Sequence, residues 1–276
     1  MNEPLEKHTF RDARPLIHRD ILGMRVDATS YPEATSLVID WARREVPRYV
    51  CVGNVNNVMY SRRDPSYLEL MNRADLVTAD GVPLVWGLKL LGAGKAVRVY
   101  GPELTRWVLD AAESRGIPVG FYGASADTMA KLLGRVRSRW PRLEIAYSHS
   151  PPFRSLSREE DDEVVRAIND SGAKILFVGL GCPKQEIWMA GHAARLKSVM
   201  LGVGAAFDFL AGTKPQAPSA MQRAGLEWLF RLASEPRRLW RRYLLNNPLF
   251  VVLFGAQVLR DRRRRRAEDN VDRRAV

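Results

Sequence analysis

The chain has 276 residues, of which 46% are hydrophobic, and its 43 Lys and Arg exceed its 31 Asp and Glu to give a net charge of +12. This composition excludes a disordered protein and suffices for one large domain with an appendage. Two distant cysteines and four scattered histidines argue against a disulfide framework and a His-based metal site, and they favour a reducing, cytoplasmic compartment.

No stretch of the chain approaches the roughly 20 apolar residues that a membrane-spanning helix needs, and the charged N-terminus lacks the apolar core of a signal peptide. We therefore expect a protein that does not cross a membrane by itself. The positive charge is concentrated between residues 223 and 274, which predicts an anionic partner for that part of the chain.

After a polar arm over residues 1–20, short apolar runs alternate with helical patterns. Strands are expected at 21–26, 48–52, 76–78, 119–122, 143–147, 174–178 and 199–203. Helices are expected at 31–44, 56–61, 67–73, 83–91, 103–115, 127–140, 158–169 and 185–196. The alternation predicts an α/β catalytic domain over residues 21–215, built on a Rossmann-like, doubly wound and mainly parallel sheet.

From residue 216 the strand pattern stops, and a basic, Trp-rich helical appendage is expected over 216–259, with one helix ending and another beginning at Pro236. Its apolar stretch at 248–259 is too short to span a bilayer and is followed by arginines at 260 and 262–266. This pattern favours a helix at the interface of an anionic membrane; an ordinary terminal helix docked on the domain is the alternative. Residues 260–276 are expected to form a disordered basic tail.

Two glycine-rich segments, Gly179-Leu180-Gly181 and Gly202-Val203-Gly204, each lie at the end of a predicted strand. Successive parallel strands place the loops that follow them at one edge of the sheet, so both segments should border one ligand-binding crevice. Gly181 and Gly204 are expected to let a ligand approach the backbone, and Asp208 follows the second segment.

The first segment continues into Pro183-Lys184-Gln185-Glu186 at the start of a helix, where a cation, an amide and a carboxylate come together. This combination suits the phosphates and hydroxyls of a nucleotide sugar. The spacing excludes a Walker P-loop, and the missing third glycine disfavours the dinucleotide fingerprint of a nucleotide-dependent oxidoreductase.

Asp80 and Asn54 each come just after a predicted strand, at the same edge of the sheet. Asp80 there could serve as a general base, and the alternative is a cap for the helix that begins near Pro83. Asn54 could orient a sugar hydroxyl, and the alternative is simple turn formation.

Two further glycine turns precede helices: Gly101, with Arg98 just upstream, and Gly123. Amides at a helix start beside an arginine can hold a diphosphate, although each glycine could simply close a loop. No Asp-x-Asp triplet occurs, so phosphate binding should depend on arginines and backbone amides. The basic segment offers candidates, with a solvated charged face as the alternative: Arg231, Arg237, Arg238, Arg241 and Arg242.

Together these residues resemble the WecG/TagA/CpsF glycosyltransferase family over about residues 21–250. The similarity rests on Asn54, Ala79-Asp80-Gly81, Arg98 with Gly101, the segments 178–186 and 202–208, and Gly225-Leu226-Glu227-Trp228. The last three blocks, in this order and spacing, carry most of the specificity.

The resemblance implies an inverting, metal-independent transfer of a sugar from a UDP-sugar to a polyprenyl-diphosphate-linked saccharide on the cytoplasmic membrane face, with no cofactor. Such an enzyme would serve the synthesis of teichoic acid linkage units, enterobacterial common antigen, or capsular and exopolysaccharides. By that likeness Asp80 is the general base, and Asn54 and Gln185 line the pocket. Arginines of an appendage that closes over the pocket would stabilise the UDP leaving group; they are Arg231, Arg238 and Arg241. The other predicted substrate-binding residues are Arg98, Gly101, Gly123, Gly181, Lys184, Glu186, Gly204 and Asp208.

Two departures from the family pattern bear on the substrate. Val52 stands where family members often carry Thr, and Ser150-Pro151-Pro152-Phe153-Arg154 replaces a His-Gly-Tyr-Phe type segment. The second departure resembles the exopolysaccharide branch, which includes the xanthan-type glucosyltransferases. The donated sugar, the acceptor glycan and the oligomeric state, a homo-oligomer included, stay open.

A non-catalytic protein that binds anionic membranes or nucleic acid through its basic C-terminus is the alternative from another functional class. Such a module would not need Asp80 and Gln185 at one edge of a sheet. We therefore predict a glycosyltransferase with no nucleic-acid partner.

Overall fold

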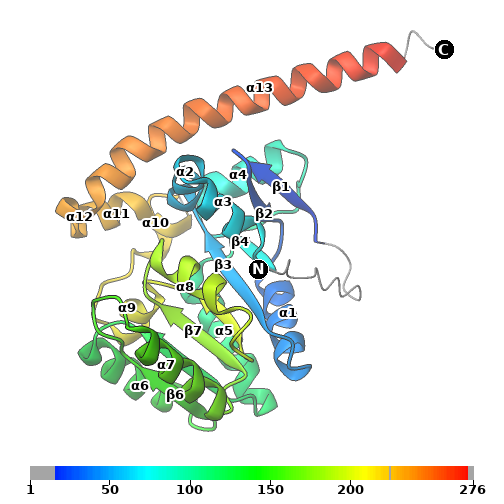
Figure 1. Cartoon of the computed structure of the whole chain (residues 1–276). Helices are drawn as coiled ribbons and strands as arrows, with labels where there is room; N and C mark the ends of the chain where they lie inside the picture. The colour runs from blue at the N-terminus through cyan, green and yellow to red at the C-terminus, as the bar shows by residue number, and fades with distance from the viewer. Residues whose placement is uncertain (1–15, 224, 273–276) are drawn as a thin grey trace.

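The structure is a computed structural model that describes residues 16–223 and 225–272. Within these residues the centre is an eight-stranded sheet in the order β1-β2-β4-β3-β8-β7-β5-β6, parallel throughout except for the pair β1–β2 (Figure 1). This confirms the predicted doubly wound, mainly parallel sheet. The strands are β1 (His18–Ile21), β2 (Met24–Asp27), β3 (Arg48–Gly53), β4 (Leu76–Ala79), β5 (Val119–Gly123), β6 (Ile145–His149), β7 (Ile175–Gly179) and β8 (Val199–Gly202).

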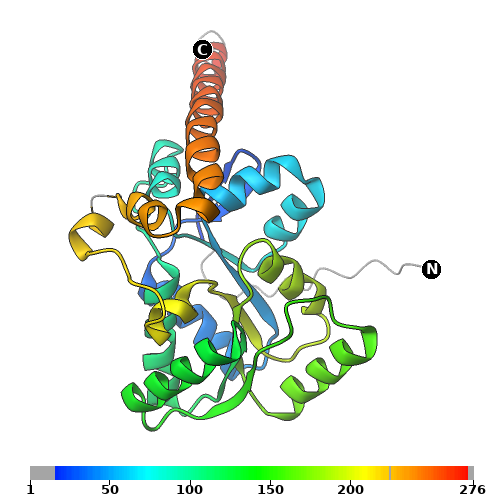
Figure 2. The same cartoon turned by 90° about the vertical axis from the view of Figure 1, so that its left-hand side faces the viewer.

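Helices cover both faces of the sheet (Figures 1 and 2). Each face has its own buried hydrophobic cluster. The helices on one face are α1 (Tyr31–Arg43), α5 (Gly101–Arg115), α6 (Ala126–Arg139) and α9 (Ala206–Ala211). Those on the other face are α2 (Val55–Arg63), α3 (Pro65–Asn72), α4 (Val82–Leu90), α7 (Arg158–Asp170) and α8 (Lys184–His192). Because both faces are covered, nearly every residue of the inner strands β3, β4, β5, β7 and β8 is buried, as in parallel sheets generally.

Local signals in the sequence set the ends of several helices. Ser30 and Glu33 form a capping box at the start of α1, in which each side chain accepts a hydrogen bond from the backbone of the other. Ser157 and Glu160 form a second capping box at the start of α7. Gly116 ends α5 in the left-handed conformation, with φ of +60°. These signals explain why most helix boundaries follow from the sequence.

The first predicted strand, over residues 21–26, is wrong. The chain instead forms an antiparallel hairpin of β1 and β2, which turns at Leu22 and Gly23 with φ of 52° and 91°. Two consecutive residues with positive φ make a tight turn whose twist matches an antiparallel pair. Leu22 is apolar and gives no turn signal, so the sequence of residues 21–26 predicts a single strand. The strand β1 begins inside the predicted arm, of which residues 1–15 lie outside the described residues.

The described chain after the sheet is helical, as predicted. It contains α10 (Ser219–Arg223), α11 (Glu227–Ser234), α12 (Pro236–Trp240), a π-helical turn (Arg241–Leu245) and α13 (Asn246–Asp272). The break between α11 and α12 falls at Pro236, where the sequence places it. Residues 260–272, predicted as disordered tail, belong to α13, so the helix continues through the arginine run.

The first half of α13 anchors the appendage to the sheet domain. Phe250 and Phe254 are buried, and Gln257 accepts a hydrogen bond from the backbone N–H of Leu22 (2.8 Å) and donates one to the carbonyl of Asp20 (2.7 Å). Beyond these contacts α13 extends past the domain (Figure 1). Of the helices that the structure describes, none has the length and apolar character to cross a bilayer.

Candidate active site

Four neighbouring strands bring the predicted polar residues to one edge of the sheet. Asn54 follows β3, Asp80 follows β4, and the two glycine segments lie at the ends of β7 and β8. These strands are adjacent in the order β4-β3-β8-β7. The backbone N–H of Asp80 donates to the carbonyl of Gly53 (2.8 Å), so Asn54 and Asp80 leave the sheet side by side.

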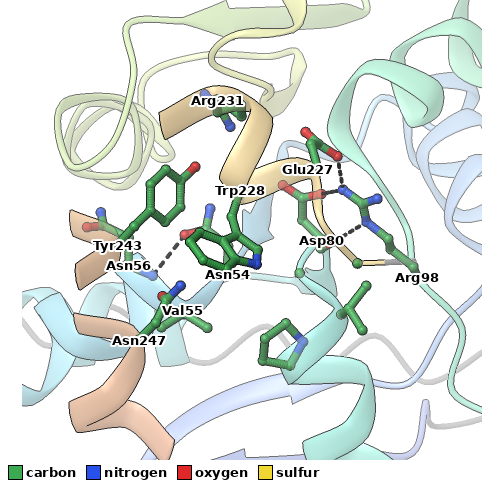
Figure 3. A pocket seen from close by; sticks show the side chains of 14 residues that line it. Asn54, Val55, Asn56, Asp80, Arg98, Glu227, Trp228, Arg231, Tyr243 and Asn247 are labelled. Carbon is green, nitrogen blue, oxygen red and sulfur yellow. Dashed lines mark hydrogen bonds and ion pairs between the residues drawn. The ribbon is translucent and has the colours of Figure 1, made fainter. Parts of the chain in front are cut away.

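Two cavities open at this edge. The larger has a volume of about 430 Å³ and is bordered by both glycine segments and by the starts of α5, α6, α8 and α9. The smaller has a volume of about 100 Å³ and lies between the sheet edge and the appendage; Figure 3 shows the side chains that line it. Asn54, Asp80 and Arg231 line both cavities. These three residues therefore stand where the two cavities meet.

Asp80 is the titratable group at this junction. Burial raises the pKa of its carboxyl from 3.8 to about 6, the Arg98 guanidinium opposes that rise, and the Glu227 carboxylate adds to it. A carboxylate with a pKa just below neutral is ionised at pH 7 and still basic enough to accept a proton. Asp80 does not cap α4, because Gly81 is the N-cap residue and no side chain makes the cap hydrogen bond. The capping interpretation of Asp80 is therefore wrong.

Arg98 joins Asp80 to the appendage (Figure 3). Its Nε donates to the backbone carbonyl of Asp80, and one terminal nitrogen lies 3.3 Å from Asp80 Oδ1 and 2.7 Å from Glu227 Oε2. The guanidinium carbon lies 4.4 Å from the centroid of the Tyr100 ring. The sequence predicts that Arg98 holds a diphosphate; in the structure one of its terminal nitrogens contacts two carboxylates and its Nε a backbone carbonyl. Its charge holds Asp80 in place and connects it to the first residue of α11.

Asn54 combines the two roles considered for it. Its Oδ1 accepts a hydrogen bond from the N–H of Asn56 (2.9 Å), while Asn57 Oδ1 accepts one from the N–H of Asn54 (3.2 Å), which caps the start of α2. The capped residue nevertheless lines both cavities. The helix cap therefore fixes Asn54 at the point where the cavities meet.

Three of the four glycines in the two segments allow close packing, and Gly181 leaves open space. A Cβ on Gly202 would lie 2.6 Å from Cε of Met189 and 3.2 Å from Nε2 of Gln185, and a Cβ on Gly204 would lie 3.3 Å from Oε1 of Gln185, so these two glycines make room for side chains of α8. A Cβ on Gly179 would lie 2.5 Å from the ring of Phe207. Gly181, with φ of +79°, has open space at its Cβ position. Of these four glycines, only Gly181 leaves free room for a ligand.

Gln185 is fixed at the wall of the larger cavity by two hydrogen bonds. Its Oε1 accepts from the N–H of Gly181 (3.1 Å), and its Nε2 donates to Glu186 Oε1 (2.9 Å). Glu186 is fully buried, and its Oε1 also accepts from Asn57 Nδ2 (3.3 Å). Burial raises the pKa of Glu186. Glu186 therefore sets the orientation of the Gln185 amide.

Asp208 lines the larger cavity together with Lys214, a residue that the sequence does not single out. Lys214 Nζ lies 2.9 Å from Asp208 Oδ2 and 3.5 Å from Glu235 Oε1. Asp208 belongs to α9 and Glu235 follows α11, so Lys214 connects the cavity wall to the appendage. Lys214 belongs to no motif, and its position becomes visible only in the folded chain.

Comparison with known proteins adds the family. A family model described as "Glycosyl transferase WecG/TagA/CpsF family" matches residues 19–267. The chain belongs to this glycosyltransferase family. It is 31% identical over 204 residues to an N-acetylglucosaminyldiphosphoundecaprenol N-acetyl-beta-D-mannosaminyltransferase of Bacillus spizizenii, over 74% of this chain and 77% of the relative. It is 29% identical over 235 residues to a protein of the same name from Staphylococcus aureus strain MW2, over 84% and 90% of the two chains. The predicted resemblance is confirmed, and membership favours an enzyme over a non-catalytic binding protein.

Several residues predicted from the family motifs are not among those lining the two cavities. Lys184 is exposed, and Arg241 is exposed with its guanidinium 5.2 Å from the Trp240 ring. Gly123 allows close packing, since a Cβ there would lie 2.6 Å from the backbone of Gly179. The side chain of Arg238 lies outside the described residues. Gly101 lies in the wall of the larger cavity, as predicted.

The appendage supplies side chains that no local pattern assigns. Trp228, Tyr243 and Asn247 line the smaller cavity together with Asn54 (Figure 3). Trp228 and Glu227 belong to the quoted segment 225–228, which signals the family but gives no role. Among the residues that the structure describes, no group of three or more His, Cys, Asp or Glu is arranged to hold a metal ion.

Proposed function

We propose that this member of the glycosyltransferase family moves a sugar from a UDP-sugar to a polyprenyl-diphosphate-linked saccharide, with inversion and without a metal ion. The transfer serves the synthesis of a cell-envelope polysaccharide. The observation that carries the proposal is Asp80, a carboxyl with a pKa of about 6 where the two cavities meet. The relatives from Bacillus spizizenii and Staphylococcus aureus are named for an acceptor of this chemical class.

In this proposal the donor occupies the larger cavity. Its volume and its position at the carboxyl edge of parallel strands suit a nucleotide sugar. The helices α5 and α8 begin at this cavity without a side-chain cap, and the positive end of a helix favours phosphate oxygens. Gln185, held in one orientation, offers its amide to a sugar hydroxyl.

The saccharide of the acceptor occupies the smaller cavity. Trp228 and Tyr243 provide aromatic faces for a sugar ring, and Asn54 and Asn247 provide amides for its hydroxyls. The appendage therefore supplies much of the acceptor wall, while Asp80 stands between acceptor and donor.

The reaction is a single displacement at the anomeric carbon. Asp80 takes the proton of the acceptor hydroxyl while the hydroxyl oxygen forms a bond to that carbon. On the opposite side, the bond between the carbon and the β-phosphate oxygen breaks, and UDP leaves with the bonding electron pair. The attack from the side opposite to UDP inverts the configuration of the carbon.

Arg231 supplies positive charge for the departing diphosphate. It lines both cavities, and its guanidinium lies 5.8 Å from the centroid of the Phe209 ring, which holds it at the cavity wall. A fixed cation stabilises charge that develops on the leaving group in the transition state. This is the role that a divalent metal ion has in many other glycosyltransferases.

The appendage also gives the protein a surface for an anionic membrane, at which its lipid-linked acceptor resides. Apolar side chains of the appendage are exposed, among them Trp240, Leu244, Leu245 and Leu249. Arginines at 260 and 262–264 follow in α13. Exposed apolar groups beside arginines are typical of helices that lie in the headgroup region. We therefore propose a peripheral protein on the cytoplasmic face of the membrane.

Substitution of the base tests the proposal. Asp80→Asn should lower the rate of sugar transfer about 10³-fold, because a general base contributes roughly that factor. Isothermal titration with UDP should give a Kd close to that of the wild type. In the wild type, kcat/KM should rise with pH through about 6, as Asp80 loses its proton. Transfer at the wild-type rate by the Asn variant would refute Asp80 as the base.

A chelator tests the absence of a catalytic metal ion. Treatment with excess EDTA should leave the release of UDP unchanged, because Arg231 takes the place of the metal ion. A loss of activity that Mn²⁺ or Mg²⁺ restores would contradict this part of the proposal. Arg231→Gln should lower kcat about 10²-fold, which measures the contribution of that charge.

A further inference from the structure

Exposed apolar side chains of α4 continue the wall of the smaller cavity. Val82 and Pro83, at the start of α4, line that cavity. Trp86 and Leu90 follow four and eight residues after Val82, on the same side of the helix. Trp86 is 62% exposed and Leu90 is 54% exposed. An apolar strip thus runs about 10 Å along α4, away from the cavity.

The helix α13 carries a second strip that starts at the same cavity. Asn247 lines the cavity, and Val251 lies one turn further on, where it is 66% exposed. The two helices touch, because a Cβ on Gly87 of α4 would lie 3.2 Å from Cζ of Phe254. Figure 2 shows α4 (cyan) beside the first half of α13 (orange). The two strips therefore flank one line of contact between helices.

This arrangement points to a ligand that leaves the smaller cavity and is apolar beyond it. Contiguous exposed apolar side chains on a soluble domain mark a binding surface. If the acceptor saccharide lies at Asp80, its diphosphate and lipid chain must leave through the opening of the smaller cavity. Val82, Pro83 and Trp228 make part of that wall apolar. The strip on α4 begins at Val82 and the strip on α13 begins at Asn247, so both offer the lipid an apolar path from this wall.

We propose that Trp86, Leu90 and Val251, together the α4–α13 strip, bind the first isoprene units of the acceptor's polyprenyl chain. The inference rests on the proposed function and adds to it a binding surface for the lipid. A bilayer contact would depend on which face of α13 lies in the headgroup region and would affect binding to vesicles, not the KM in detergent. A chain leaving the cavity contacts only the side of α13 that continues from Asn247.

The test compares two acceptors in detergent: the same saccharide diphosphate on an undecaprenyl chain and on a methyl group. Leu90→Asp and Val251→Asp should each raise the KM for the undecaprenyl acceptor about tenfold, since each removes apolar contact with the chain. The KM for the methyl acceptor should stay within about twofold, because no lipid reaches the strip.

Val252→Asp is the matched control. Val252 is the next residue of α13 and is 68% exposed, but it points about 100° away from Val251 around the helix. This variant should leave both KM values unchanged. If Val251→Asp and Val252→Asp behave alike, and both reduce sedimentation with phosphatidylglycerol vesicles, the strip contacts the bilayer and the proposal is wrong.

A binding measurement separates failure of the strip from failure of the proposed function. Farnesyl diphosphate, titrated against the full chain and followed by tryptophan fluorescence, should bind with a Kd that Leu90→Asp raises about tenfold. This result would support the strip even if no sugar were transferred to either acceptor. Absence of farnesyl diphosphate binding, or an unchanged Kd in the variant, would overturn it. A dimer seen by analytical ultracentrifugation and lost in Leu90→Asp would assign the strip to a second copy instead.

Discussion

The two walls of the active site are held in different ways. The wall formed by the sheet consists of residues that follow β3, β4, β7 and β8, whose backbones the ladder hydrogen bonds fix. Asp80 and Gln185 lie in this wall, and both are tied by hydrogen bonds to groups beside them. Its geometry is therefore set before any substrate binds.

The wall formed by the appendage is attached at separate points along a helical segment. Arg98 reaches Glu227, Lys214 reaches Glu235, and Gln257 reaches the turn between β1 and β2. Between these points the appendage exposes large apolar side chains, such as Leu229 and Leu245. Exposed apolar groups of this size are typical of surfaces that bind partners.

This difference indicates that the two walls have different roles. The proposed proton transfer needs a group held within a fraction of an ångström, which a parallel sheet provides. The proposed acceptor carries a lipid, so the wall that meets it would contact both a sugar and a membrane surface. The sheet wall therefore carries the proposed base, and the appendage carries most of the proposed acceptor contacts.

Removal of the appendage is the strongest test of this division. A chain that ends at Gly225 loses Glu227, Trp228 and Arg231, so transfer should fall at least about 10³-fold. The truncated chain should no longer sediment with anionic vesicles. Circular dichroism should still show a cooperative thermal transition, because the two cores lie on the sheet. Wild-type turnover, or retained sedimentation, would show that the appendage is neither a wall nor an anchor.

A change in the sheet wall should affect stability more than a change elsewhere on the domain. Gly179→Ala places a Cβ 2.5 Å from the buried Phe207 ring, so the free energy of unfolding should fall by about 2 kcal/mol. Gly134→Ala is the matched control, since it lies exposed in α6 with open space at its Cβ position. That change should raise the free energy of unfolding by up to about 1 kcal/mol. Urea denaturation measures both, and equal effects would contradict tight packing at Gly179.

The smallest predicted effect is on the pH dependence of activity, and it comes from Glu227, where the appendage contacts the sheet wall. Glu227→Gln removes a negative charge that raises the pKa of Asp80. The rise of kcat/KM on the acidic side of its pH profile, the acidic limb, should therefore move to lower pH. At pH 8, where Asp80 is ionised in both proteins, activity should stay within about threefold of the wild type. Glu235→Gln removes a charge that pairs with Lys214 and should leave the limb in place. A limb that moves equally in both variants would argue against a specific contact of Glu227.

Much of the sheet wall could be predicted from the sequence, because its signals are local. Apolar runs that end in Asn54, Asp80 and the glycine segments place those residues at strand ends, and parallel strands bring the ends together. The hairpin at Leu22 could not be predicted, because an apolar residue with positive φ is not one of the residues typical of such turns. The packing of Gly202 and Gly204 could not be predicted either, because their neighbours Met189 and Gln185 come from α8.

The sequence by itself determined the family, the doubly wound sheet, the strand end that Asp80 follows and the helix start that carries Gln185, because hydrophobic periodicity and motif spacing are local features of the chain. Only the tertiary structure decided that Arg98 serves Asp80 and Glu227 together, that Lys214 joins a cavity wall to the appendage, and that Asp80 stands between two cavities. The physical reason is the distance along the chain: Arg98 and Glu227 are 129 residues apart. Packing of the folded appendage against the sheet brings such groups within reach of each other.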